Sequence, residues 1–430
     1  MIKHKDFNFI KTVQDISEYS LKTNRLTVLY KHIPDTGVIT SNIVYLAGAR
    51  DELIGETGVA HMLEHMVFKP TKYDKERGLK DSGAMNFERN TGSVLNANTW
   101  KDRTCYYFSY RKENFSRVLQ IEAERMQDVL LIDEEFKPER TNVLSEYDMY
   151  NGEPEFALSV AMVGTAYHSH PYGHETIGFR EDIERYTTEK LQRFYKRFYS
   201  PNNATLIVVG DIDEKSVLDK VADLFKNIAP DPTVEDRPVT VEPKQEGVRR
   251  VEVVRAGNTN ILAIGVKHGG FPTKNWFETM LTFKMLAGGA DSLFGKHLVD
   301  TGLASAVSFM QEPTKDENLG IIYITLAGKT KSEKIEEKVL QLIKNIDQKW
   351  LKKRLKTTVA KAISSELYGR DSSLDIAGEM TEYIASGDWS TYFKTKELLS
   401  KITVKDIEKN IQELFTETKM TIGNYKSFKQ

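Results

Sequence analysis

The sequence predicts an α+β protein composed of two similar units. Three observations support this fold class. The chain has 430 residues, which is too long for a single ordinary hydrophobic core. Strand-like and helical segments both occur, and the second half repeats the order of elements found in the first half. A stretch rich in proline and charge separates the halves, as expected of a linker.

The first half begins with strand patterns and then changes to a helical period. Two β-like runs lead into a segment whose apolar residues recur with the spacing of a helix. We expect strands at 26–30, 39–45, 104–110 and 204–210, and helices at 57–68, 113–129, 138–150, 188–198 and 214–225.

The second half follows a segment with four prolines and no apolar period, at residues 227–246. We therefore expect a first domain at 1–228, a linker at 229–248 and a second domain at 249–430. In the second domain we expect strands at 250–255, 261–267 and 321–326, and helices at 276–286, 292–300, 332–349 and 351–367.

Composition excludes several classes of protein and of site. The 40% hydrophobic and 28% charged residues are typical of a globular chain, and the net charge of -2 gives no overall attraction to nucleic acid. Cys105 is the only cysteine, so an intramolecular disulfide and a thiolate zinc site are both excluded. We expect no secretory signal at residues 1–14, no membrane span and a cytoplasmic location, although a mature exported enzyme would look the same.

The segment His61-Met-Leu-Glu64-His65 has the spacing of a metal site. Residues i and i+4 share a face of a helix, so both imidazoles can bind one ion with Glu64 beside them. Zinc accepts imidazole and carboxylate ligands, and Glu64 is suited to take a proton from water that the metal acidifies. The pattern H-x-x-E-H is that of the inverzincins.

The alternative reading is an amphipathic helix with two surface histidines. With nine histidines in the chain, the pattern should arise by chance on the order of once in a hundred chains, which favours the metal site. Glu139 and Glu146 lie seven residues apart on one face of the expected helix 138–150, and either could supply a third ligand.

Six segments of the sequence carry a family resemblance. They are 58–68 around the H-x-x-E-H motif, 95–99 (Leu-Asn-Ala-Asn-Thr), 104–107 (Thr-Cys-Tyr-Tyr), 139–146 (Glu-Arg-Thr-Asn-Val-Leu-Ser-Glu), 170–173 (His-Pro-Tyr-Gly) and 198–204 (Phe-Tyr-Ser-Pro-Asn-Asn-Ala). Together they resemble the pitrilysin and mitochondrial processing peptidase family of zinc metallopeptidases, closely in the first half of the chain and more loosely in the second.

This resemblance implies a role for each matching residue. It makes Zn²⁺ the cofactor, His61, His65 and Glu146 its ligands, and Glu64 the general base. Glu139 would be a supporting carboxylate of the catalytic site. Residues 81–91 then read as an insertion, which lengthens the spacing from His65 to Glu146.

The resemblance also implies how a peptide substrate binds. Asn96 and Ala97 fall where the family places an edge strand that pairs with the substrate backbone. The family architecture implies antiparallel-rich sheets with helices packed on one side, arranged as half of a clam-like chamber. Such a chamber limits substrates to short or unfolded peptides.

The second half departs from the family in one respect. Leu298 and Ser305 stand where active members carry an Arg and a Tyr that contact the substrate. A related subunit that supplies this pair would form a heterodimer with the chain, while a homodimer is possible and would lack the pair.

Two alternatives remain open. His168, His170 and His174 lie within seven residues and could suggest a second metal site, although the family resemblance explains the His170-Pro-Tyr-Gly loop without metal. The leading function is a zinc-dependent endopeptidase, and the alternative function is a non-catalytic structural core subunit of a larger complex.

Overall fold

The computed structural model describes residues 2–234 and 237–428. They form two compact units, each assembled from three segments of the chain. Unit 1 comprises Met1–Glu146, Glu175–Pro238 and Gly369–Phe393, and unit 2 comprises Tyr147–His174, Val239–Tyr368 and Lys394–Gln430. Each unit therefore includes a segment from the other half of the sequence, and the linear domain ranges 1–228 and 249–430 stay a prediction.

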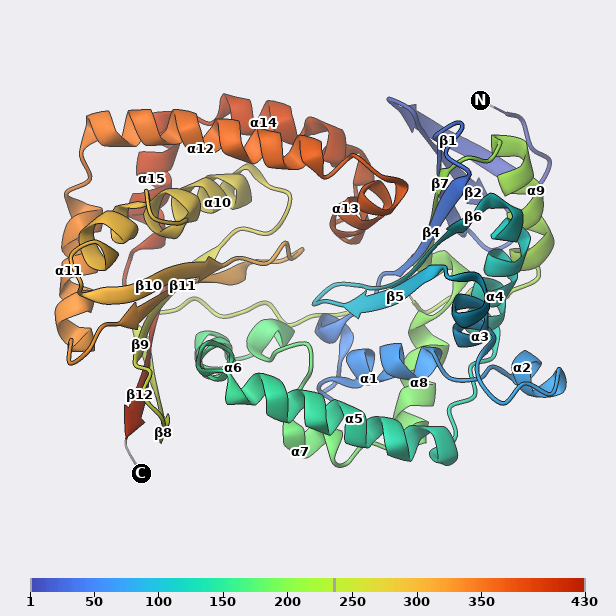
Figure 1. Cartoon of the computed structure of the whole chain (residues 1–430), viewed down its shortest axis with the longest axis horizontal. Coiled ribbons are helices and arrows are strands. Elements are labelled where there is room, and N and C mark those ends of the chain that lie inside the picture. The colour runs from blue at the N-terminus through green and yellow to red at the C-terminus, as the bar shows by residue number, and fades with distance from the viewer. Residues whose placement is uncertain (1, 235–236, 429–430) are drawn as a thin grey trace. The chain divides into compact units, whose positions relative to one another are not determined.

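Unit 1 is built on a seven-stranded sheet in the order β1-β2-β3-β7-β4-β6-β5 (Figure 1). All neighbouring strands are antiparallel except β3 and β7, which are parallel. The strands are β1 (Phe7–Val13), β2 (Ile16–Leu21), β3 (Thr27–His32), β4 (Val38–Tyr45), β5 (Val94–Thr99), β6 (Thr104–Arg111) and β7 (Ala204–Gly210).

Helices of unit 1 pack on both faces of this sheet. Arg125 of α4 lies over the rings of Tyr106 and Phe108 on one face, whereas α13 bonds to Thr40 and Asn42 on the other. The helices are α1 (Val59–Val67), α2 (Lys72–Glu76), α3 (Gly83–Thr91), α4 (Phe115–Gln127), α5 (Asp133–Gly152, in unit 1 up to Glu146), α7 (Arg180–Ile183), α8 (Thr188–Phe198), α9 (Glu214–Phe225) and α13 (Ser373–Ala385).

The segment 81–91, which the sequence suggested as an insertion, contains the capped helix α3 (Gly83–Thr91). The Ser82 side chain accepts a hydrogen bond from the Met85 N–H at the start of α3. Gly92 ends the helix with a left-handed φ of 65°, a conformation that glycine adopts without strain.

Unit 2 is built on a five-stranded sheet in the order β10-β11-β9-β12-β8. Met162 of α6 packs against Gly265 and Gly423 on one face, and Phe283 of α10 packs over Gly320. The strands are β8 (Arg249–Ala256), β9 (Ile261–His268), β10 (Ala304–Met310), β11 (Asn318–Leu326) and β12 (Met420–Phe428). The helices are α6 (Pro154–Ala166), α10 (Lys274–Ala287), α11 (Ser332–Lys344), α12 (Gln348–Tyr368), α14 (Thr395–Lys401) and α15 (Val404–Leu414).

The fold class expected from the sequence is confirmed as α+β with two sheets and packed helices. In unit 1, helices pack on both faces of the sheet and not on one side alone, because α13 covers the face opposite to α4. Among the described residues, no helix combines the length and the apolar character needed to cross a bilayer.

Candidate metal centre

The helix α1 carries the H-x-x-E-H motif and begins at a position that requires glycine. Gly58 has a φ of 87°, and a Cβ there would collide with the Ile177 carbonyl. The Glu52 carboxylate accepts hydrogen bonds from the Gly58 N–H at 2.7 Å and the Ala60 N–H at 2.9 Å. A carboxylate at this end satisfies unpaired N–H groups and complements the helix dipole.

Three side chains converge as a possible metal-binding group. Ligand atoms of His61, His65 and Glu146 all lie within 4.8 Å of one another. Glu146 Oε2 lies 3.8 Å from His61 Nε2 and 3.5 Å from His65 Nε2. Two ligand atoms about 2.0–2.1 Å from a tetrahedral zinc lie about 3.4 Å apart, so the two distances from Glu146 are close to those of a zinc site, and the donor types also suit zinc. In the described part of the chain, this is the one such group.

Glu139 lies behind His65 and outside the three-residue group. The His65 ring hydrogen bonds through Nδ1 to Glu139 Oε1 at 2.8 Å, which leaves Nε2 facing Glu146. Glu139 also pairs with Lys69 and accepts a hydrogen bond from Asn142 Nδ2 at 3.3 Å. Although burial opposes its charge, the contacts with His65 and Lys69 lower the pKa of Glu139 to about 2. An anionic partner of this kind fixes the orientation of a metal-binding histidine.

The two histidines differ in their affinity for protons. Burial and the neighbouring charge of His65 lower the pKa of His61 to about 4, so its ring is neutral at pH 7. Burial also disfavours the charged form of His65, but hydrogen bonds to Glu139 and Glu146 outweigh it and raise its pKa to about 9. Metal binding to His65 Nε2 would therefore displace a proton.

Glu64 is almost completely buried next to this group, with 9% of its surface exposed. Its Oε2 accepts a hydrogen bond from the Thr99 hydroxyl at 2.6 Å. Burial raises the pKa of Glu64, while the bond from Thr99 and the charge of His65 act in the opposite direction. A carboxylate with a raised pKa is a stronger base than a solvated one.

The strand β5, which contains Asn96 and Ala97, is the outermost strand of its sheet (Figure 1). It pairs with β6, and no described strand pairs with its other edge. The Ala97 N–H donates a hydrogen bond to Asn96 Oδ1 at 2.8 Å. Thr99, the last residue of β5, contacts Glu64, so the C-terminal end of this edge strand lies next to the candidate metal centre.

The histidines of the 168–174 loop do not form a second metal-binding group among the described residues. His170 pairs with Asp316 at 3.1 Å, and its Nδ1 accepts a hydrogen bond from the Tyr172 N–H. The Glu242 carboxylate accepts hydrogen bonds from the backbone N–H groups of residues 168–170. The loop is thus held by hydrogen bonds and an ion pair to other residues of unit 2.

The positions expected to lack Arg and Tyr lie in unit 2. Leu298 is completely buried in the short π-helical segment Gly295–Val299. Ser305, on β10, is exposed. Neither side chain has the charge or the phenol group that the resemblance associates with substrate binding.

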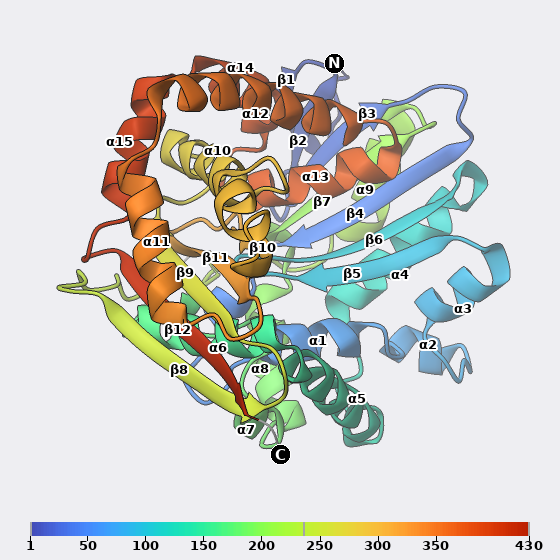
Figure 2. The ribbon, with the colours of Figure 1, turned by 60° about the vertical axis from the view of Figure 1, so that its left-hand side comes forward.

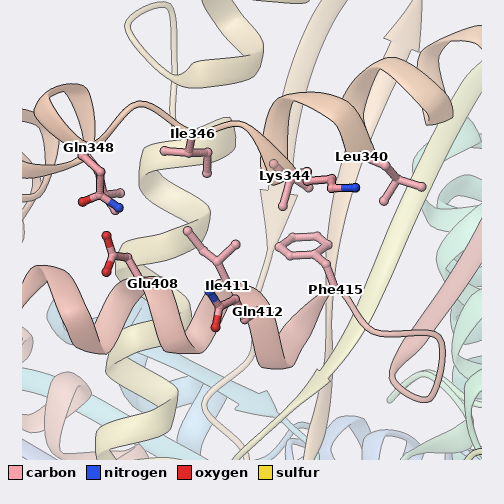
Figure 3. Close-up of a pocket in the computed structure, with 10 residues that line it drawn as sticks. Leu340, Lys344, Ile346, Gln348, Glu408, Ile411, Gln412 and Phe415 are labelled. Carbon is pink, nitrogen blue, oxygen red and sulfur yellow. The ribbon is translucent and has the colours of Figure 1, made fainter.

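A surface groove of unit 2 is unrelated to the metal centre in its chemistry. It has a volume of about 510 Å³ and lies where α11, α12 and α15 meet. Figure 3 shows Gln348 and Glu408 pointing toward one another across it, with Ile411 and Phe415 nearby. Its lining contains no histidine or cysteine.

Sequence patterns did not identify three contributors to the centre. These are Glu52, which caps α1, Thr99, which bonds to Glu64, and Lys69, which pairs with Glu139. The sequence spacing could have suggested Lys69, because it lies four residues after His65 and such residues are neighbours on a helix. Glu52 and Thr99 come from a loop and a strand that only the fold brings to the helix.

Comparison with known proteins identifies the family. Residues 27–179 match the family model described as insulinase (peptidase family M16), and residues 185–361 match the peptidase M16 inactive domain. The zinc protease PqqE of Helicobacter pylori is 29% identical over 399 residues, which cover 90% of this chain and 87% of the relative.

Two further relatives support the assignment. The crystal structure of a protease from Helicobacter pylori superposes with a TM-score of 0.87 and 28% identity, covering 96% of this chain and 99% of that one. A probable mitochondrial-processing peptidase subunit beta of Arabidopsis thaliana is 28% identical over 197 residues, which cover 46% of this chain and 36% of the relative. The chain belongs to the M16 family of peptidases, which includes pitrilysin and the mitochondrial processing peptidases.

Proposed function

We propose that this chain is a zinc-dependent endopeptidase that hydrolyses peptide bonds in short or unfolded polypeptides. The observation that carries the proposal is the group of His61, His65 and Glu146 donor atoms with buried Glu64 beside it. The zinc protease among the relatives supports the choice of metal. A bound zinc ion would polarise the scissile carbonyl and acidify water.

Within this mechanism, Glu64 accepts the proton of the attacking water and delivers it to the leaving amine. Its burial strengthens it as a base, and the Thr99 hydroxyl fixes one oxygen so that the other is left for water. Glu139 and Lys69 hold the His65 ring in the orientation that directs Nε2 toward Glu146. Glu64 is thus the general base in this proposal, and Glu139 and Lys69 position the His65 ring.

The edge of β5 supplies a binding mode that suits extended peptides. A peptide that adds to this edge makes main-chain hydrogen bonds, so its chain must be extended over several residues. Folded proteins rarely expose such a segment. Asn96 and Ala97 would contribute to this pairing, with the Asn96 side chain leaving the Ala97 N–H when the peptide binds.

A related second subunit would complete the site. Leu298 and Ser305 offer neither a cation nor a phenol for the substrate carbonyl, and such groups stabilise charge that develops during hydrolysis. A subunit that carries the Arg and Tyr would form a heterodimer with this chain. The related processing peptidase is itself described as a subunit.

A non-catalytic role as a core subunit is the second candidate. It is favoured by the match of residues 185–361 to a domain described as inactive and by Leu298 and Ser305. The intact H-x-x-E-H motif and Glu146 favour the enzyme instead.

Turnover of a quenched fluorescent peptide separates the two candidates. The chain is assayed alone and mixed with a related subunit that carries the Arg and Tyr. We expect turnover in the mixture, its loss on treatment with a chelator and its return with one equivalent of zinc. Zinc binding without turnover in either sample would support the structural role.

A further inference from the structure

Unit 2 contains a polar cavity at the N-terminal end of α11, with a volume of about 560 Å³. The end of β11, the loop after it and residues of β9 and β12 form its walls. Figure 2 shows α11 beside β9 and β12, and the helix packs on β9. The lining of the cavity includes Lys329, Lys331, Ser332, Glu333, Asn424 and Lys426.

The first turn of α11 begins without a side-chain cap. Lys331 holds the N-cap position, and its side chain accepts no hydrogen bond from the helix. No described residue accepts a hydrogen bond from the backbone N–H groups of residues 332–334. Unpaired N–H groups give the N-terminus of a helix a partial positive charge, for which an anion is a suitable partner.

The lysines of the cavity add to this positive charge. Lys329 and Lys331 form no ion pair with a described residue. Cations are favourable at the opposite end of a helix, so two lysines at this end are unfavourable unless an anion joins them. Lys426 is already paired with Glu252 at 2.5 Å, and Glu333 is the one acidic residue in the described lining. The lining therefore has a net positive charge.

Strand register and an ion pair bring Asn424 to this end of α11. Arg250 of β8 pairs with Glu336 of α11, with Nη2 lying 2.7 Å from Oε1. Arg250 is the register partner of Ile422 on β12, and Asn424 follows two residues later on the same face of the sheet. Ser332 precedes Glu336 by about one turn of the helix. Ser332 and Asn424 therefore line the same cavity, one from the helix and one from the sheet.

Both of these side chains have polar atoms without a partner in the described part of the chain. Asn424 Oδ1 is buried, and no described residue donates a hydrogen bond to it. Only 9% of the surface of Ser332 is exposed, and its hydroxyl bonds to no described residue. Buried polar groups are normally paired. A ligand that meets these requirements has acceptors for the N–H groups and the hydroxyl, and one donor for Asn424 Oδ1.

We propose that this cavity binds inorganic phosphate in its singly protonated form, HPO₄²⁻. The unprotonated oxygens would accept hydrogen bonds from the N–H groups of residues 332–334 and from the Ser332 hydroxyl, and would pair with Lys329 and Lys331. The O–H group would donate to Asn424 Oδ1. The inference does not depend on the proposed peptidase function.

The proton distinguishes phosphate from related anions. Sulfate has the same shape and charge but carries no proton at neutral pH, so it would place an oxygen against Asn424 Oδ1 and leave that acceptor unpaired. A phosphate monoester such as phenyl phosphate has also lost its last proton at pH 8. Both anions should therefore bind more weakly than inorganic phosphate.

Equilibrium dialysis of the purified chain against labelled phosphate at pH 8 tests the proposal. We expect one phosphate per chain, and competition by sulfate and by phenyl phosphate that is about tenfold weaker than by unlabelled phosphate, because a buried acceptor is left unpaired. Competition by sulfate or phenyl phosphate as strong as by phosphate would overturn the protonated ligand. Absence of saturable phosphate binding would overturn the site.

Asn424→Leu isolates the buried acceptor. Leucine is similar to asparagine in size and removes the unpaired oxygen, so the variant should fold. We expect it to bind phosphate and sulfate with equal affinity. A preference for phosphate as large as that of the unmodified chain would show that Asn424 does not receive the proton.

Lys331→Glu tests the positive charge at the start of α11. Lys331 is exposed, so the variant should fold, and we expect its affinity for phosphate to fall about tenfold or more. The matched control Lys356→Glu changes an exposed lysine of α12 outside the lining and should bind phosphate as the unmodified chain does. Both variants keep the candidate metal centre, so phosphate bound there would not distinguish them. Equal affinity of Lys331→Glu and the control would overturn the site.

Discussion

At the scale of single residues, the candidate metal centre is supported by side chains outside the group of His61, His65 and Glu146. Glu139 holds His65 through a 2.8 Å hydrogen bond and is itself paired with Lys69. We expect Glu139→Gln to weaken zinc binding about 10- to 100-fold, the usual effect of removing such a partner. Competition with a zinc-binding dye measures this.

The control for this prediction lies on the same helix. Glu134 is exposed near the start of α5, and Glu134→Gln should bind zinc as the unmodified chain does. Equal zinc affinity of Glu139→Gln and the unmodified chain would show that His65 needs no carboxylate behind it.

His268 predicts a dependence of stability on pH in unit 2. The residue is fully buried on β9, and burial lowers its pKa from 6.5 to about 4. Below pH 6.5 the unfolded chain binds a proton that the folded chain cannot, so stability falls as the pH falls from 6.5 toward 4. The free energy of unfolding should lose about 2 kcal/mol from this residue between pH 7 and pH 5.

Comparison with His268→Asn isolates that contribution. Asparagine can keep the hydrogen bond that the ring makes through Nδ1 to the Gly269 carbonyl, and it does not titrate. Urea denaturation of both proteins at several pH values should give curves that converge as the pH falls. Parallel curves would mean that His268 accepts a proton in the folded state.

At the scale of elements, the edge of β5 makes a prediction about substrate binding. We expect Ala97→Pro to raise the KM for peptides at least tenfold and to leave zinc affinity unchanged. Proline is tolerated on an edge strand where the N–H does not serve the sheet, and the Ala97 N–H already bonds to Asn96 Oδ1. An unchanged KM would place peptide binding elsewhere.

The sequence predicted the elements that carry a clear local pattern. The expected strands at 39–45, 104–110 and 204–210 correspond to β4, β6 and β7, and the expected helix 57–68 contains α1. The expected helix 332–349 is shorter, because α11 ends at Lys344 and a new helix begins at Gln348.

Two of the elements that sequence reasoning omitted, β12 and α13, are defined by contacts distant in the chain, whereas the omitted strands β1 and β2 pair locally with each other. β12 pairs in parallel with β8, about 170 residues earlier, and α13 reaches Thr40 of β4 through Ser373. Local periodicity contains no information about such partners. The motif residues were predictable because they are close together in the sequence. Thr99 and Glu52 were not, because only the folded chain brings them to the motif helix.

At the scale of the whole molecule, we expect peptide turnover to depend on a related partner subunit. Leu298 is completely buried, so an arginine there would place a charge in an apolar interior. We expect the double variant Leu298→Arg, Ser305→Tyr to melt at a lower temperature and to gain no turnover. Ser305→Tyr alone, at an exposed position, should melt as the unmodified chain does.

The opposite result would be equally informative. If the purified chain alone turned over peptides as fast as its mixture with a related subunit, the site would need no Arg and Tyr from a partner. The absence of Arg at Leu298 and of Tyr at Ser305 would then have no effect on catalysis.

The most direct measurement is the zinc content and peptide turnover of Glu64→Gln, assayed with the related subunit. Glutamine can still accept the hydrogen bond from Thr99, so the variant should fold. We expect one zinc per chain, as in the unmodified protein, and turnover lower by a factor of about 10²–10⁴. An exposed control, Glu189→Gln, should retain both. Turnover of Glu64→Gln close to that of the control would contradict the assignment of Glu64 as the general base.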